Sequence, residues 1–154
     1  LMDEAYRQRV ANTDLSDVEQ FPSEGREHLP EGTRIAYRTD PPTSGPHYDK
    51  VAEPRFYEQP VNPGYLVHNL EHGHVIIYYD PERTPEAALD YVRTLTRRYR
   101  GVWDAVLAVP RSLEHEVLIL TAWQHMLRLE TFDPAKVDAF VDAYRGRGPE
   151  NPVR

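Results

Sequence analysis

The sequence predicts an α+β fold, in which a small, mainly antiparallel sheet carries two helices on one face and a long proline-rich loop. Three observations support this class. Residues 75–79 (VIIYY) are β-branched and aromatic, which is typical of a buried strand. Residues 84–101 and 133–146 place apolar side chains at helical spacing. Prolines crowd residues 39–64 and exclude both a helix and a central strand there.

The N-terminal part of the chain is charged and only weakly patterned. Residues 1–24 are predicted to form an arm, and apolar residues at helical spacing over 15–21, ahead of Pro22, allow a short helix within it. Residues 33–38 then alternate apolar with polar side chains. This alternation predicts a half-buried strand.

The first long helix is predicted to begin at residues 84–86 (TPE), where a hydroxyl side chain caps the helix and proline occupies its first position. It is expected to end at Gly101. Two predicted strands follow, at residues 103–109 and 116–123, with a polar turn between them. We therefore expect these two strands to pair as a hairpin.

The second long helix is predicted to begin at Asp133 and to end at Gly146. Together these elements predict a single α+β domain over residues 25–148, followed by a frayed tail at residues 149–154. A ferredoxin-like arrangement is one special case of this class, although the pattern does not determine the strand order.

Composition restricts the partners and ligands that the chain can use. The formal net charge of -7 over 154 residues argues against a nucleic-acid partner, because phosphate binding needs clustered Lys and Arg. No stretch of 18 or more apolar residues is present, so we expect no membrane contact by this fragment itself. Cysteine is absent, which leaves imidazole, carboxylate and thioether groups as metal ligands.

The histidines predict a metal site. His68 and His72 are four residues apart, a spacing that places them on one face of either a helix or a strand. The proline-rich loop, whose conformation its prolines restrict, is expected to bring His47 to the same place. Three imidazoles are a usual set for a transition metal. Met126 is the most attractive fourth ligand, since it closely follows the strand that ends at Trp123.

Other residues near these positions have simpler interpretations. By strand parity Met126 shares a face with Leu118 and Leu120, which makes a core methionine the plain alternative to a ligand. By the same parity Glu71 points away from His68 and His72, so a supporting carboxylate is preferred to a ligand. His28, His74 and His125 remain open as further ligands, whereas His115, in a turn, is interpreted as a structural residue.

Several motifs resemble those of an uncharacterised bacterial family known as the domain of unknown function 3105. The motifs are residues 25–28 (GREH), 41–48 (PPTSGPHY), 67–73 (VHNLEHG) and the segment from Thr121 to Asp133. The resemblance marks His28 along with the three histidines of the predicted site. It also implies an extracytoplasmic protein, secreted or tethered by an N-terminal hydrophobic segment that is not part of these 154 residues.

The leading hypothesis from the sequence is an extracytoplasmic domain that binds one transition metal ion through His47, His68, His72 and Met126, and that takes part in metal handling. Copper is the first choice of metal, because a thioether and an oxidising compartment suit it, and zinc is the second. One alternative is a metal-dependent enzyme with Glu71 as base. Another is a partner-binding module without a metal, for which the sequence identifies no protein partner.

Overall fold

The computed structural model describes residues 4–154. Four helices and seven strands follow one another along this part of the chain. In order they are α1 (Glu4–Asn12), β1 (Glu19–Gln20), β2 (His28–Leu29), β3 (His47–Tyr48), α2 (Pro63–His72), β4 (Val75–Tyr79), α3 (Glu86–Arg98), β5 (Val106–Pro110), β6 (Leu118–Ala122), β7 (His125–Leu129) and α4 (Pro134–Tyr144).

The five-stranded sheet has the order β1-β7-β6-β4-β5. Only β4 and β5 pair in parallel, whereas the other neighbours in this sheet are antiparallel. A separate two-stranded sheet joins β2 and β3 in parallel. The predicted α+β class with a mainly antiparallel sheet is confirmed.

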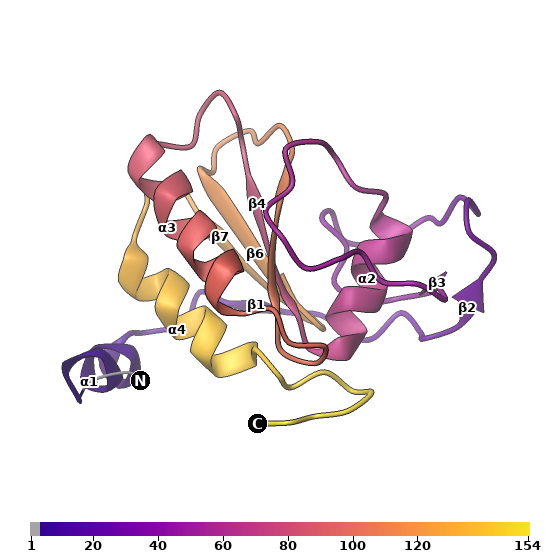
Figure 1. The fold of residues 1–154 in the computed structure, drawn as a ribbon, viewed down its shortest axis with the longest axis horizontal. Coiled ribbons are helices and arrows are strands. Elements are labelled where there is room, and N and C mark those ends of the chain that lie inside the picture. The colour runs from indigo at the N-terminus through magenta and orange to yellow at the C-terminus, as the bar shows by residue number, and fades with distance from the viewer. Residues whose placement is uncertain (1–3) are drawn as a thin grey trace.

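Helices cover both faces of the five-stranded sheet (Figure 1). Val92 of α3 and Phe140 of α4 belong to one buried apolar cluster, together with Ile77 of the central strand β4. The two helices therefore share one face, as predicted. Leu70 of α2 belongs to a second cluster on the opposite face. Helix α2 was not predicted, and it carries much of the candidate site.

The predicted hairpin between the strands near residues 103–109 and 116–123 is wrong. Strand β4 lies between β5 and β6 and pairs with both. Its five residues are all buried, as is typical of a central strand whose two faces are covered by other elements. The hairpin is instead β6–β7, joined at Trp123 and Gln124, where Gln124 has a φ of 67°. The adjacent parallel pair β4–β5 also rules out a ferredoxin-like arrangement, whose βαβ units are split.

Two predictions about the first forty residues are also wrong. The helix near the N-terminus is α1, whereas residues 15–21 are not helical and contribute β1 to the edge of the sheet. Residues 33–38 form no strand, and the segment contacts the proline-rich loop instead. The hydroxyl of Tyr37, for example, donates to the carbonyl oxygen of Pro46 at 2.5 Å.

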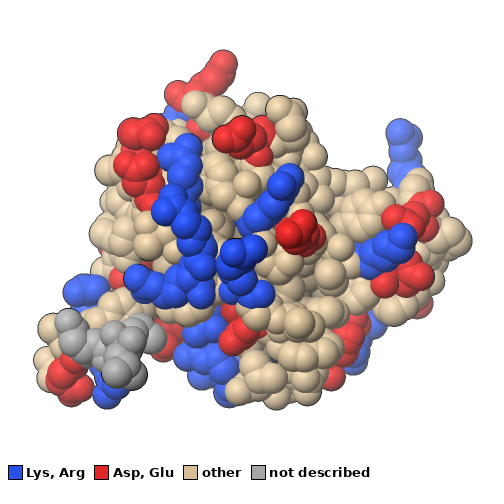
Figure 2. Space-filling view, in the orientation of Figure 1, with Lys and Arg blue, Asp and Glu red and all other residues tan. Residues whose placement is uncertain are grey.

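Basic side chains gather over α3, despite the acidic net charge (Figure 2). A hollow beside this helix is lined by Arg55, Arg93, Arg97 and Arg100 together with Phe56. Arg93 is paired with Glu86 and Asp90, which neutralise part of this charge. Within residues 4–154, no helix has the length and hydropathy needed to cross a membrane.

Candidate metal centre

Helix α2 forms because its ends carry strong helix signals. Asn62 caps its N-terminus, where the side-chain oxygen accepts from the amide of Gly64 at 2.9 Å, and Pro63 occupies the first turn. The helix ends at Gly73, whose φ is 104°. His68 and Glu71, three residues apart, therefore lie on one helical face. The expectation that Glu71 points away is wrong, because it assumed an extended backbone.

The proline-rich loop is held firmly against α2. Its residues 41–48 are almost all buried. Tyr48 is 1% exposed and packs over Gly64, where an added Cβ would come within 2.4 Å of the tyrosine ring. This close approach brings β3 against α2 and sets the position of His47, the neighbour of Tyr48.

A parallel pairing brings His28 to the same place. Strand β2 pairs with β3 so that His28 lies directly opposite His47, and the amide of His47 donates to the carbonyl oxygen of Glu27 at 2.9 Å. The two imidazole rings are 4.9 Å apart between centroids. His28 is exposed, whereas His47 is completely buried.

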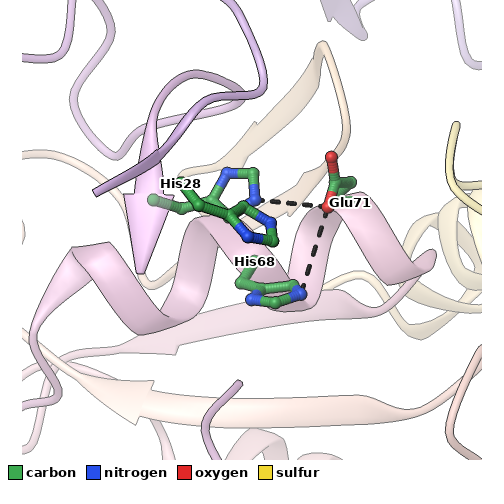
Figure 3. Close-up of side chains that lie close together, drawn as sticks. His28, His68 and Glu71 are labelled. Carbon is green, nitrogen blue, oxygen red and sulfur yellow. Dashed lines mark ion pairs between the residues drawn. The ribbon is translucent and has the colours of Figure 1, made fainter. Parts of the chain in front are cut away.

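Three imidazoles and one carboxylate converge at this point. One ligand atom from each of His28, His47, His68 and Glu71 lies within 4.8 Å of the others. The ring of His68 is 4.8 Å from that of His47 and 5.3 Å from that of His28. Figure 3 shows His28, His68 and Glu71 turned toward a common centre. We call these four residues the inner cluster.

Hydrogen bonds to the backbone orient two of the imidazoles. Nδ1 of His47 lies 2.8 Å from the carbonyl oxygen of Gly45, and Nδ1 of His68 lies 2.7 Å from that of Tyr48. A carbonyl oxygen only accepts, so each Nδ1 carries the proton. In the neutral ring, each Nε2 therefore has no proton and carries a lone pair, which is the form that binds metals.

Both of these Nε2 atoms face the same oxygen of Glu71. Oε1 lies 3.2 Å from Nε2 of His47 and 4.0 Å from Nε2 of His68. Within residues 4–154, Nε2 of His47 has no hydrogen-bond partner although it is buried. Lone pairs of neutral imidazoles that face a carboxylate oxygen repel it unless a cation lies between them. This arrangement matches what a metal ion would require.

Arg26 holds the other oxygen of Glu71. Its Nε donates to Oε2 at 2.7 Å. Burial alone would raise the pKa of Glu71, but the hydrogen bond and the positive charge of Arg26 oppose it, and the pKa lies below its ordinary value. Burial lowers the pKa of His68, and the hydrogen bond to Tyr48 offsets only part of that effect. Both groups therefore favour the ligand form, an ionised carboxylate and a neutral imidazole.

His72 lies beside the inner cluster but faces elsewhere. Its ring is 4.9 Å from that of His68, so the two histidines converge as their spacing predicts. Its Nδ1 is 3.0 Å from the carbonyl oxygen of Val102, and its Nε2 is 3.4 Å from Oε2 of Glu150. Its carboxylate neighbour is thus Glu150 of the C-terminal tail, a residue that no sequence motif indicated.

The other histidines have structural surroundings. His74 is buried, with Nδ1 3.0 Å from the side-chain amide of Asn69 and Nε2 2.6 Å from the carbonyl oxygen of Val102. Both of its nitrogens are therefore used by the protein. His125 stacks on Tyr144, with ring centroids 4.3 Å apart. His115 lies in the loop between β5 and β6 and is exposed, and its amide donates to Oε1 of Glu116 at 3.3 Å.

Met126 is completely buried in the apolar cluster beneath α2. It pairs with Thr121 across the β6–β7 hairpin and so shares a face with Ile119, not with Leu118 or Leu120. The parity argument was wrong because the two-residue turn resets the alternation between strands. Glu71, and not Met126, accompanies His47 and His68 in the geometry described above.

Comparison with known proteins identifies a family. A family model described as "Protein of unknown function (DUF3105)" matches residues 28–154, a range that includes the whole inner cluster. A search of the curated proteins and a search of the solved structures gave no significant match. The site must therefore be interpreted from its own geometry.

Proposed function

The chain belongs to the DUF3105 family, which has no assigned function, and from the geometry of its site we propose that it binds one transition metal ion. The ligands would be His28, His47, His68 and Glu71. The observation that carries the proposal is the buried Nε2 of His47, which lies 3.2 Å from Oε1 of Glu71 and has no hydrogen-bond partner among residues 4–154.

The set of ligand atoms suits a metal ion of intermediate softness. Three imidazole nitrogens with one carboxylate oxygen are typical of zinc, Cu(II) or iron, whereas a thioether selects Cu(I). Since Glu71 takes the place proposed for Met126, copper remains our first choice as Cu(II), and zinc is the second. Sites of this kind generally bind Cu(II) more tightly than zinc. Metal handling, by storage or transfer of the ion, is the role that such binding supports.

The support for binding also includes the protein groups behind the ligands. Two imidazoles are oriented by backbone carbonyl oxygens, and Arg26 orients the carboxylate. Such outer contacts are characteristic of metal sites, because they fix the ligand atoms before the ion arrives. A partner-binding module without a metal would have no need of free Nε2 atoms that point toward one carboxylate oxygen.

A competition titration tests the proposal. Purified protein is titrated with Cu(II) and, separately, with zinc against a chromophoric chelator, and the bound metal is counted by mass spectrometry. We expect one tight site, and we expect His47→Ala, His68→Ala and Glu71→Gln each to weaken it at least about tenfold. His115→Ala is the matched control, because His115 lies outside the cluster.

Two outcomes would contradict the proposal. One is the absence of stoichiometric metal in the wild-type protein after exposure to both ions. The other is a loss of affinity in the His115 variant equal to that in the cluster variants, which would indicate adventitious histidine binding. Folding of each variant is checked by circular dichroism, so that an unfolded protein is not mistaken for one that has lost a ligand.

We also propose an extracytoplasmic location, which the family resemblance supports. The natural gene product is fused to a reporter that is active only outside the cytoplasm, and reporter activity is compared with that of a cytoplasmic control fusion. Inactivity of the reporter in a stable, full-length fusion would overturn this part of the proposal.

A metal-dependent enzyme remains the alternative use of the same site. His28 is the exposed member of the set, so its displacement would open a coordination position to a substrate or to water. Glu71 is less suited to act as base, because Arg26 holds its carboxylate in the ionised, low-pKa form. Hydrolytic or oxidative turnover by the metal-loaded protein, lost in Glu71→Gln, would favour this alternative.

A further inference from the structure

A second group of ligand atoms adjoins the inner cluster. Atoms of His68, His72 and Glu150 lie within 4.8 Å of one another. We call these three residues the outer cluster. His68 belongs to both clusters, but His72 and Glu150 are more exposed than the buried His47 and Glu71. The outer cluster therefore lies beside the inner cluster and opens to solvent at His72 and Glu150, whereas the inner cluster opens at His28.

The residues of the outer cluster are held in place by specific contacts. Val102 accepts from Nδ1 of His72, so that Nε2 is the unprotonated atom, and it points toward Glu150. The ring of His72 also packs on Trp103, with centroids 4.4 Å apart. His72 ends α2, where the unpaired carbonyl groups of the helix favour a cation.

The C-terminal segment is folded back to deliver Glu150. The amide of Glu150 donates to the carbonyl oxygen of Glu71 at 3.3 Å. Gly148 lies so close to the end of α2 that an added Cβ would come within 2.3 Å of that same oxygen. The tail at residues 149–154, expected to be frayed, is exposed, but its residue Glu150 is hydrogen-bonded to the end of the helix that carries residues of both clusters.

The shared residue determines how the two clusters can be used. Nδ1 of His68 is engaged with the carbonyl oxygen of Tyr48, which leaves Nε2 as its one metal-binding atom. Because this nitrogen has a single lone pair, His68 can ligate an ion in either cluster but not in both at once. When Nε2 of His68 ligates an ion in one cluster, it is therefore not a ligand in the other cluster.

We propose that the outer cluster is an entry position, where His72 and Glu150 capture a divalent transition metal ion with His68 and water. Exchange of Nε2 of His68 from one position to the other then passes the ion to the inner cluster. The inference rests on the proposed function of the inner cluster. No bond other than metal–ligand bonds is made or broken in this step, and water is released as the ion moves inward.

Stopped-flow fluorescence with Cu(II) tests the entry position. Bound Cu(II) quenches nearby indoles, and Trp103 touches His72, so we expect a fast quenching phase when the ion is captured. His72→Gln and Glu150→Gln should lose this phase and should load the inner cluster at least about tenfold more slowly, with an equilibrium Kd within about threefold of that of the wild type. Trp103→Phe should lose the optical signal but retain the loading rate, which is followed by the visible absorbance of Cu(II).

His47→Ala separates the two proposals. It should keep the fast quenching phase but lose the tight site, because His47 belongs only to the inner cluster. Fast quenching that is lost in His72→Gln and Glu150→Gln, without a tight site in the wild type, would retain the outer position and overturn the inner one. Wild-type loading rates and undiminished quenching in both His72→Gln and Glu150→Gln would overturn the entry position. Glu150→Asp, which shortens the carboxylate but keeps its charge, should restore part of the rate.

Discussion

Nε2 of His47 lies 3.2 Å from Oε1 of Glu71, and both side chains are buried. The two groups come from different parts of the fold, since His47 belongs to β3 and Glu71 to α2. A buried imidazole lone pair against an ionised carboxylate is unfavourable without a proton or a metal ion between them. This contact is the basis of the first two predictions.

Metal binding should stabilise the fold through Glu71. An ion at about 100 times its dissociation constant should add about 2.7 kcal/mol to the free energy of unfolding, which corresponds to a rise of roughly 5–10 °C in Tm. In Glu71→Gln we expect little or no rise, because the neutral amide removes the charged ligand. Calorimetry with and without Cu(II) measures both values. An equal rise in the two proteins would exclude Glu71 as a ligand.

Arg26 should set the pH range over which the inner cluster binds metal. Its hydrogen bond helps to hold the pKa of Glu71 below the ordinary value, so Arg26→Gln should raise that pKa. A proton then competes with the metal at acidic pH, and affinity should fall more at pH 5 than at pH 7.5. Chelator competition at the two pH values measures the difference. A uniform loss at both would mean that Arg26 only supports the fold.

His74 should make the metal-free protein sensitive to acid. Burial is the largest cause that lowers the pKa of His74, to about 4. The unfolded chain binds this proton near pH 6.5, whereas the folded protein does not, so this contribution to stability is complete above pH 6.5 and is lost as the pH falls toward 4. The loss should be roughly 3 kcal/mol in the free energy of unfolding.

Urea unfolding of the metal-free protein between pH 4 and pH 7 measures this effect. His74→Gln should give a flatter profile than the wild type over that window, even though it is less stable at neutral pH. His115→Gln is the control and should leave the profile unchanged, since this side chain is outside the core. Parallel profiles for the wild type and His74→Gln would contradict the assignment.

Gly64→Ala should destabilise the protein and loosen the inner cluster. Alanine normally stabilises a helix relative to glycine, but here its Cβ would come within 2.4 Å of the ring of Tyr48. We expect a loss of about 1–3 kcal/mol in the free energy of unfolding and a weaker metal site, because His47 adjoins Tyr48. Combining Gly64→Ala with Tyr48→Leu should cost less than the sum of the two single changes. Strict additivity would show that the two residues do not interact.

Met126→Leu should leave metal affinity unchanged. Met126 is fully buried among apolar side chains, and leucine has a similar volume, so the free energy of unfolding should fall by less than about 1.5 kcal/mol. Titration with Cu(II), and with Cu(I) under reducing conditions, measures the affinity. A loss of about tenfold or more for Cu(I) alone would restore Met126 as a ligand.

Local patterns in the sequence were sufficient for the regular elements with strong signals. The apolar run at β4, the amphipathic stripe of α3 and the Asp133 cap of α4 each depend on neighbours in the chain, whereas the predicted hydroxyl cap of α3 is wrong, because Thr84 donates to the carbonyl oxygen of Val117. The convergence of His68 and His72 also followed from spacing alone, because four residues return to one face of a helix or strand. The fold class and the histidine-rich character of the site were therefore accessible without coordinates.

Tertiary structure decided which residues complete the site. The direction of Glu71 depended on whether residues 63–72 are helical, and the N-cap that begins this helix, Asn62, lies outside the histidine motif of residues 67–73. His28 joins His47, a residue distant in the sequence, through the pairing of β2 with β3, and Glu150 comes from the C-terminal tail, where its amide donates to Glu71. Pairings between distant segments depend on how whole surfaces fit together, and no local period of the sequence encodes them.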